Sequence, residues 1–293
     1  MKPAPFEYHR PDSVEEALGL LASHGWDAKV LAGGQSLVPA MNFRLAQPAV
    51  LVDLNRIPGL DHIAERDGAL RIGTMARQRA AERSELVALR APLLAEALPF
   101  VAHPQVRNRG TVGGSIAHAD PAAELPAVML ALGARFHLAG PGGARAVEAD
   151  RFFTGLFSTA LEPEEMLLEV EVPARGPAQG WAFDEISRRH GDFALAGLAA
   201  WVALGQDGRC SGARIALLGV GSGPVLARGA AEALVARDAT DEGIRAAAEA
   251  AAAEIEPPSD IHASAAYRRR LVEVLVRRTL PRAFARARMG SPG

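Results

Sequence analysis

Two short stretches of the sequence combine adjacent glycines with side chains that donate hydrogen bonds. They read GGQS at residues 33–36 and TVGGS at residues 111–115. Glycine lets backbone N–H groups approach a ligand closely, and hydroxyl and amide groups add further donors. Two such turns can hold a diphosphate from both sides. The pattern therefore predicts a phosphate-bearing cofactor, with two ordinary turns as the alternative.

Neither turn matches a standard nucleotide-binding motif. A P-loop requires Gly-Lys-Ser/Thr and a Rossmann fingerprint requires GxGxxG, and neither turn has either spacing. The only lysines of the chain are Lys2 and Lys29. A diphosphate that is held without lysine indicates a large, permanently bound cofactor rather than a nucleotide that turns over.

Other motifs predict no chemistry of their own. The stretch at 219–234 resembles a dinucleotide loop, but Pro224 stands at the third glycine position, which favours a structural turn. His103, His118 and Asp120 match the ligand spacing of no standard metal site. No Ser/His/Asp set has the context of a nucleophilic triad. We therefore expect no metal ion and name no catalytic side chain.

The composition limits the partners and the location. Hydrophobic residues make up 49% of the chain, charged residues 23%, and the net charge is −2. This balance is typical of a soluble globular protein and favours neither nucleic acid nor an anionic membrane as partner. The longest apolar stretch, residues 193–205, is too short to span a bilayer, and the first residues lack the apolar core of a signal peptide. We therefore expect a cytoplasmic protein.

Cys210 is the only cysteine of the chain. An internal disulfide is therefore excluded, and so is an iron–sulfur cluster that is ligated only by cysteines of this chain.

The secondary-structure elements of residues 1–173 must position the two turns. Residues 10–25 read as a capped helix, and residues 28–34 as a short buried strand that enters the first turn. A helix that starts near Pro121 follows the second turn. Further strands are predicted at 49–57, 68–77, 134–140 and 165–173, and the stretch 78–98 is predicted to be helical.

The Pro- and Gly-rich stretch at 173–180 is the best linker. Strands within 186–204 and 213–221 and an alanine-rich helical tail at about 229–287 follow it. The arginines at 268–270 read as a solvated helix face. The whole chain is predicted to be α+β, with a nucleotide-type domain before the linker and a smaller domain after it.

The sequences around the two glycine turns resemble those of a known protein family. AGGQSLVP at 32–39, together with RNRGTVGGSIAHADPAAELP at 107–126, resembles the FAD-binding subunit of the molybdenum hydroxylases. That family includes the carbon monoxide dehydrogenase medium subunit and the xanthine dehydrogenase flavin domain. The resemblance runs from FEYHRPDSVEEAL to PPSDIHASAAYRRRLVEVLVRR, nearly the whole chain. It implies a two-part FAD-binding domain of the PCMH/vanillyl-alcohol-oxidase type at 1–176 and a smaller α+β C-terminal domain of the carbon monoxide dehydrogenase flavoprotein type at 177–288.

Carried over by position, the resemblance also implies a set of FAD-binding residues. Glu124 stands where an acidic residue holds cofactor hydroxyls, with Asp120 as a second candidate. Leu167 matches an apolar residue against the cofactor. Phe193 falls where some relatives place an aromatic ring near the flavin, with a core phenylalanine as the alternative. The implied set is Leu31, Ala32, Gly33, Gly34, Gln35, Ser36, Leu37, Val101, Thr111, Val112, Gly113, Gly114, Ser115, Asp120, Glu124, Leu167 and Phe193.

The chain departs from the family pattern at one position beside the flavin. Some relatives carry a flavin-contacting lysine just before the SRR stretch, where this chain has Asp184, Glu185 and Ile186. A cation there would stabilise the reduced anion of the flavin, so its absence leaves the redox tuning open. Arg188 is the candidate substitute.

The family implies an electron-transfer flavoprotein subunit. A large molybdenum-cofactor subunit would act on the substrate, and a small subunit with two [2Fe–2S] clusters would deliver electrons to FAD. NAD or a quinone would accept them, and the assembly would be a heterotrimer, itself doubled. The alternatives are a free-standing flavoenzyme of the same fold and a cofactor-binding or assembly module without redox turnover.

Overall fold

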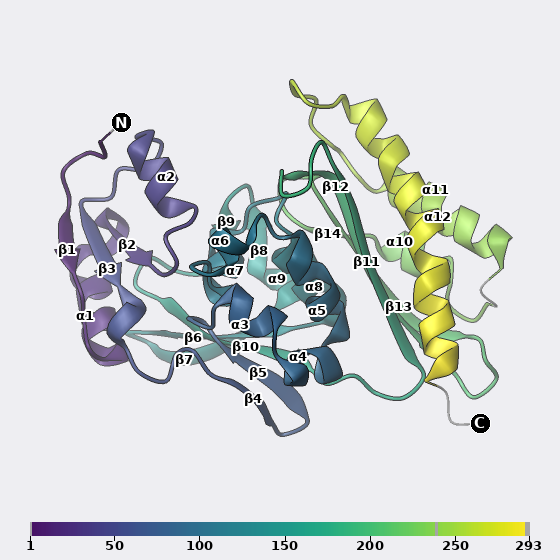
Figure 1. Cartoon of the computed structure of the whole chain (residues 1–293), viewed down its shortest axis with the longest axis horizontal. Coiled ribbons are helices and arrows are strands. Elements are labelled where there is room, and N and C mark those ends of the chain that lie inside the picture. The colour runs from purple at the N-terminus through teal and green to yellow at the C-terminus, as the bar shows by residue number, and fades with distance from the viewer. Residues whose placement is uncertain (1, 238–239, 291–293) are drawn as a thin grey trace.

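The computed structural model describes residues 2–237 and 240–290 of the chain. Apart from a two-stranded sheet of β8 and β9, three sheets follow one another along the long axis of the molecule, as the purple, blue-teal and green parts of Figure 1 show. The first two belong to the part of the chain before the linker, and the third to the part after it.

The first sheet is small and parallel, in the order β1-β3-β2. Its strands are β1 (Glu7–His9), β2 (Ala28–Leu31) and β3 (Val50–Asp53). Helix α1 (Val14–His24) connects β1 to β2; the Ser13 side chain caps its start by accepting from the Glu16 N–H, and Gly25 ends it with a φ of 52°. The first glycine turn follows β2 directly and leads into α2 (Leu37–Asn42).

The second sheet has five antiparallel strands in the order β4-β5-β10-β6-β7. These strands are β4 (Ile63–Arg66), β5 (Ala69–Gly73), β6 (Arg135–Gly140), β7 (Gly143–Glu148) and β10 (Met166–Pro173). Apolar side chains of β5, β6 and β10 share a core with α5 (Pro92–Ala97), α7 (Val112–His118) and α8 (Glu124–Leu132). The remaining short elements of this part are α6 (Pro104–Arg107), α9 (Ala149–Phe152), β8 (Phe153–Gly155) and β9 (Ser158–Thr159).

The predicted helical stretch at 78–98 is divided into α3 (Gln78–Glu82), α4 (Glu85–Arg90) and α5. The Ser84 hydroxyl caps α4 by accepting from the Val87 N–H at 3.3 Å, and Pro92 occupies the first turn of α5. Both residues favour helix starts, which explains why one stretch forms several short helices.

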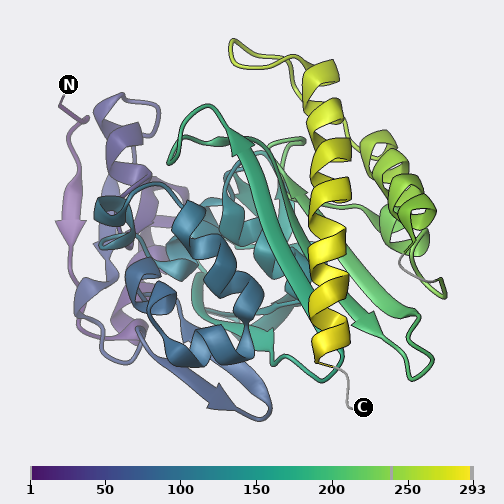
Figure 2. The ribbon, with the colours of Figure 1, turned by 45° about the vertical axis from the view of Figure 1, so that its right-hand side comes forward.

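The third sheet is antiparallel, in the order β11-β12-β13-β14. Its strands are β11 (Gln179–Ser187), β12 (Ala194–Leu204), β13 (Cys210–Leu218) and β14 (Val225–Leu226). Helices α10 (Arg228–Glu232), α11 (Asp241–Ala253) and α12 (Ala265–Met289) lie on one side of this sheet, and α5 and α8 lie on the other (Figure 2). Because both faces are covered, β12 is apolar almost throughout.

The structure therefore places the longest apolar stretch in a central strand. Among the described residues, no helix is long and apolar enough to cross a membrane.

Two local predictions need correction. Residues 188–193, within the predicted strand region 186–204, form the connection between β11 and β12. The helix expected near Pro121 begins at Glu124, because the Asp120 carboxylate first accepts from the Ala122 N–H in a turn.

The prediction of a solvated arginine cluster at 268–270 was wrong for one of its members. Arg268 is only 4% exposed, and its guanidinium donates to the carbonyls of Leu195 and Gly219 and to Asp260. These carbonyls come from the ends of β12 and β13, so the residue ties α12 to the sheet.

Candidate functional site

The two glycine turns lie against each other in the folded chain. A Cβ atom added to Gly33 would stand 2.8 Å from the Gly110 Cα, and one added to Gly114 would stand 3.4 Å from the Ala32 Cβ. The turns are almost 80 residues apart in sequence: the first follows β2 of the first sheet, and the second follows α6 and forms the start of α7, which packs on the second sheet. The fold thus builds one site from both.

The first turn offers free backbone donors. The N–H groups of residues 33–37 make no hydrogen bond within the described chain, and these residues are partly or fully exposed. The Gln35 side chain is turned back and donates to the Gly33 carbonyl at 3.1 Å. A run of unpartnered N–H groups next to a helix start is a ready acceptor site for phosphate oxygens.

The second turn differs, because its backbone donors are already used. The N–H groups of Val112 and Gly113 donate to the carbonyls of Ala76 and Thr74, and the Gly114 N–H donates to the Thr111 hydroxyl at 2.9 Å. A Cβ on Gly113 would stand 2.6 Å from the Thr74 Cα. This glycine thus allows α7 to pack on the end of β5, and the turn offers side chains such as that of Ser115 rather than N–H groups.

Two arginines border the first turn. Arg77 donates to the Arg109 carbonyl and to Asn55 Oδ1, the latter at 2.6 Å, and Asn55 Nδ2 donates to the Ala32 carbonyl at 2.9 Å. Burial, and then the positive charge of Arg109, lower the pKa of Arg77. The exposed Arg109 side chain has no hydrogen bond or ion-pair partner among the described residues.

Sequence reasoning missed Asn55, Arg77 and Arg109, although Arg109 stands only two residues before Thr111, where the second turn begins. Arg77 and Arg109 add positive charge beside the first turn, which has no lysine.

Buried carboxyl groups gather behind the second turn. Glu124 is the first residue of α8 and is 7% exposed. Its pKa is raised to about 7: burial and then the charge of Asp120 raise it, while a hydrogen bond from its own backbone N–H and the charge of Arg107 oppose the shift. Glu185 of β11 faces it from the third sheet: burial raises its pKa to about 8, with Glu124 and Asp184 as further causes. Its Oε2 is buried without a hydrogen-bond partner.

The apolar candidates divide into core and surface residues. Leu167 is 4% exposed at a register shift in β10, and Val101 is 9% exposed, with its carbonyl accepting from Arg107 at 2.7 Å. Phe193 is 71% exposed in the connection before β12, so the core alternative for this ring is wrong. Leu31, at the end of β2, is half-buried.

Two other residues considered in the sequence analysis, Arg188 and His118, contact side chains outside the two turns. Arg188, suggested as a substitute for the missing lysine, lies 3.0 Å from His262 Nδ1. Burial lowers the pKa of His118, whose ring centroid lies 5.1 Å from that of Phe157. Within residues 2–237 and 240–290, no group of His, Cys, Asp and Glu has the geometry of a metal site.

Comparisons with known proteins agree in one family. The family model "FAD binding domain in molybdopterin dehydrogenase" matches residues 4–175, and "CO dehydrogenase flavoprotein C-terminal domain" matches residues 181–283. The chain is 46% identical over 288 residues to the alpha subunit of the 6-hydroxypseudooxynicotine dehydrogenase complex of Paenarthrobacter nicotinovorans, covering 98% of this chain and 97% of that one. It is 45% identical over 287 residues to the carbon monoxide dehydrogenase medium chain of Hydrogenophaga pseudoflava, covering 98% and 99%.

Solved structures give the same result. Carbon monoxide dehydrogenase from Hydrogenophaga pseudoflava superposes with a TM-score of 0.95 at 45% identity, covering 98% of this chain and 99% of that one. Quinoline 2-oxidoreductase from Pseudomonas putida 86 superposes with a TM-score of 0.92 at 41% identity, also covering 98% and 99%.

Proposed function

The chain belongs to the FAD-binding medium subunits of the molybdenum hydroxylases, and from this premise we propose that it is the electron-transfer subunit that stands between [2Fe–2S] clusters on a partner chain and an external acceptor. It is an FAD-dependent oxidoreductase subunit, as its relatives are subunits of dehydrogenase complexes. The observation that carries the proposal is the run of free N–H groups at residues 33–37, held against the second glycine turn.

The residues present fit a dinucleotide with a diphosphate. The free N–H groups of residues 33–37 bind the diphosphate oxygens, and Arg109 and Arg77 neutralise their charge. The second turn, residues 111–115, positions the first by packing and adds the Ser115 hydroxyl. Two guanidinium groups thus replace the lysine that other phosphate sites use.

Polar and apolar side chains further along the site hold the rest of the cofactor. Glu124 accepts from cofactor hydroxyls, with Asp120 beside it, since a carboxylate can accept several hydrogen bonds. Leu167 and Val101 line the apolar side, and the exposed ring of Phe193 is free to stack on the flavin.

When bound, FAD supplies the ability to accept electrons singly and to release them in pairs. The chain itself binds the cofactor, orients it and controls charge around it. With a pKa of about 8, Glu185 holds its proton at neutral pH and therefore adds no negative charge to the site. Arg188, on the connection that carries Phe193, is the cation closest in sequence to the position of the missing lysine.

The proposed assembly follows the family. The partners are a large molybdenum-cofactor subunit and a small [2Fe–2S] subunit in a doubled heterotrimer, with NAD or a quinone as acceptor, in the cytoplasm. The single cysteine, Cys210, is buried and supports the placement of the clusters on another chain. The proposed domain limits are 1–176 and 177–288.

Binding of FAD to the purified chain tests the cofactor site. The parent should show flavin absorption bands, and Arg109→Gln should bind FAD roughly tenfold more weakly, because it loses a charge-assisted contact to phosphate. Arg66→Gln is the matched control, since Arg66 is also exposed and lies at the tip of the β4–β5 hairpin. Equal affinities in the three proteins would contradict the placement of the diphosphate.

The native protein tests the electron-transfer role. Purification from its source should give a complex with molybdenum and iron–sulfur subunits, in which substrate reduces the flavin. A stable monomer that oxidises its own small-molecule donor would instead support the free-standing flavoenzyme. Bound flavin that neither partner subunits nor dithionite reduce would support the binding module.

A further inference from the structure

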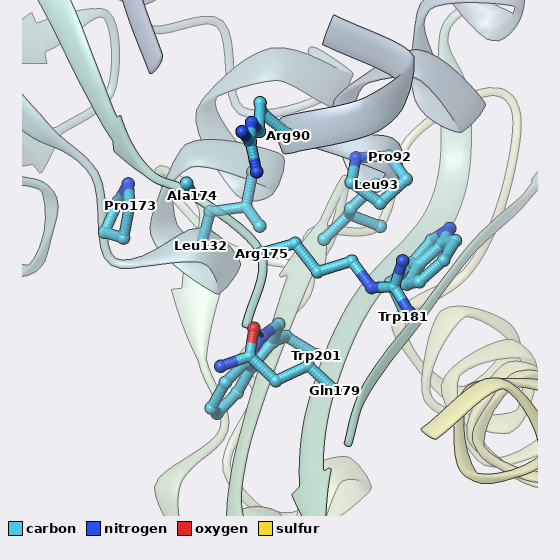
Figure 3. Close-up of a pocket in the computed structure, with 10 residues that line it drawn as sticks. All are labelled: Arg90, Pro92, Leu93, Leu132, Pro173, Ala174, Arg175, Gln179, Trp181 and Trp201. Atoms are coloured by element: carbon cyan, nitrogen blue, oxygen red, sulfur yellow. Dashed lines mark hydrogen bonds between the residues drawn. The ribbon is translucent and has the colours of Figure 1, made fainter. Parts of the chain in front are cut away.

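A small cavity lies where the linker between β10 and β11 passes between the two parts of the chain (Figure 3). Its volume is about 80 Å³. Arg90, Leu93 and Leu132 line it from the helices before the linker, Arg175 comes from the linker, and Gln179, Trp181 and Trp201 come from the third sheet. The cavity is thus built by both parts of the chain and lies on the linker, whereas the proposed cofactor site lies at the two glycine turns.

Arg175 brings a positive charge that no carboxylate in the described part of the chain neutralises. Its guanidinium lies over the Trp181 ring, 4.7 Å from the centroid, and its Nε is buried without a hydrogen-bond partner. The neighbouring Arg90 pairs with Glu65 at 2.9 Å, and Arg286, on Trp181 at 5.2 Å, is bound to Glu96. A buried donor without a partner is costly in a folded protein and therefore calls for an acceptor.

Gln179 is a further polar residue of the cavity wall, and its amide points away from the Arg175 guanidinium (Figure 3). Its side-chain oxygen accepts from the Gly176 N–H at 2.9 Å and from Trp201 Nε1 at 3.3 Å. The amide NH₂ group is left without a partner among the described residues. No Asp or Glu lines the cavity, so its free polar groups are donors, and its other walls are apolar or aromatic.

The size of the cavity limits the ligand. A cavity that accepts benzene has about 150 Å³, and a water molecule takes up about 30 Å³ of liquid. We propose that this cavity binds a small carboxylate such as acetate, held by the guanidinium of Arg175, with its apolar end toward Leu93 and Leu132. The planar fork of arginine matches the two carboxylate oxygens.

This inference goes beyond electron transfer and does not depend on FAD. Because the lining comes from both parts of the chain, a bound carboxylate links them and stabilises the folded state by mass action.

Tryptophan fluorescence of the full chain provides the test. The chain has three tryptophans, and Trp26, between α1 and β2, is 79% exposed. Trp26→Phe therefore leaves only the two cavity tryptophans as reporters. In this background, sodium acetate replaces sodium chloride at constant ionic strength. We expect a saturable fluorescence change and a rise in Tm with acetate.

Two variants test the binding site, and a third is the control. Arg175→Gln should weaken acetate binding roughly tenfold, since a charge-assisted contact is lost. Gln179→Glu is nearly isosteric and places a carboxylate in the cavity, so it should abolish the acetate response in both readouts. Arg245→Gln, at an exposed position of α11, should behave as the background protein.

A change that is linear in acetate, or an equal response in Arg175→Gln and the background protein, would overturn the proposal. The same half-saturation with benzoate would also overturn it, because that ring exceeds the cavity.

Discussion

Gly113 shows how a residue in a cofactor motif can be required for packing. Its N–H is bonded to the Thr74 carbonyl, and an added Cβ would stand 2.6 Å from the Thr74 Cα. The glycine therefore sets the distance between the second turn and β5, and the first turn depends on that distance because Gly114 packs on Ala32.

We predict that Gly113→Ala destabilises the chain by about 1–3 kcal/mol, the usual cost of overpacking, and lowers the content of bound FAD. The matched control is Gly19→Ala in the interior of α1, where an added Cβ meets nothing within 4 Å. That change should stabilise the chain by roughly 0.5–1 kcal/mol. Urea unfolding measures both, and equal unfolding midpoints for the two variants would contradict the packing role.

Glu124 and Glu185 make stability depend on pH. Their folded pKa values, about 7 and about 8, lie above the ordinary value of 4.5. Between pH 4.5 and 8 the folded state therefore binds more protons than the unfolded state, and the free energy of unfolding falls as the pH rises. The contribution of each group is fully present below pH 4.5 and is lost as the pH passes its folded pKa.

We predict that Glu185→Gln flattens this slope between pH 5 and 8, by at most about 1.4 kcal/mol per pH unit. Urea unfolding at pH 5.5, 7 and 8.5 measures the slope, and Glu249→Gln at an exposed position of α11 is the control. A slope in Glu185→Gln as steep as that of the parent would refute the assignment.

At the scale of elements, the connection between β11 and β12 is exposed over most of its length. Residues 188–190 and 192–193 are exposed, and Gly191 packs on the His103 ring with a φ of 88°. Phe193 thus lies at the exposed C-terminal end of this connection, whose middle is fixed by the contact between Gly191 and His103.

Phe193→Ala should change the stability of the FAD-free chain by less than about 0.5 kcal/mol, because the ring is 71% exposed. It should weaken FAD binding by roughly threefold to tenfold, the usual worth of an aromatic stacking contact. Flavin fluorescence quenching gives the affinity. Trp26→Ala removes an aromatic ring that is similarly exposed, at 79%, but lies between α1 and β2, and it should leave the affinity unchanged. If Phe193→Ala also leaves the affinity unchanged, the Phe193 ring is not part of the site.

At the scale of the whole molecule, the two parts of the chain share a core. Phe183 of β11 packs edge-to-face on Phe100, with centroids 5.1 Å apart, and lies in the same buried cluster as residues of α5 and α8. Glu96 of α5 pairs with Arg282 and Arg286 of α12, both at 2.5 Å. The third sheet is therefore fixed on both faces.

We predict that the parts unfold together and that Phe183→Ala lowers the stability of the whole chain by about 3–5 kcal/mol, as other large core truncations do. Differential scanning calorimetry should show one transition that moves as a unit. A component that remains at the parent Tm would show that the two parts unfold separately.

The expected family, the two-part fold with its C-terminal α+β domain, the FAD cofactor and the oxidoreductase class are confirmed. These predictions rest on contiguous sequence motifs, above all those at residues 32–39 and 107–126. Helix starts also followed local chemistry, since Ser13 caps the predicted first helix.

The tertiary structure alone decided which groups of the site are free. Both turns look alike in sequence. However, the carbonyls of Thr74 and Ala76 accept hydrogen bonds from backbone N–H groups of the second turn, whereas the N–H groups of the first turn have no partner in the described chain. The same holds for the burial of Arg268 and the exposure of Phe193. Hydrogen-bond partners and burial come from segments far away along the chain, and a local pattern contains no information about which distant segment will pack against it.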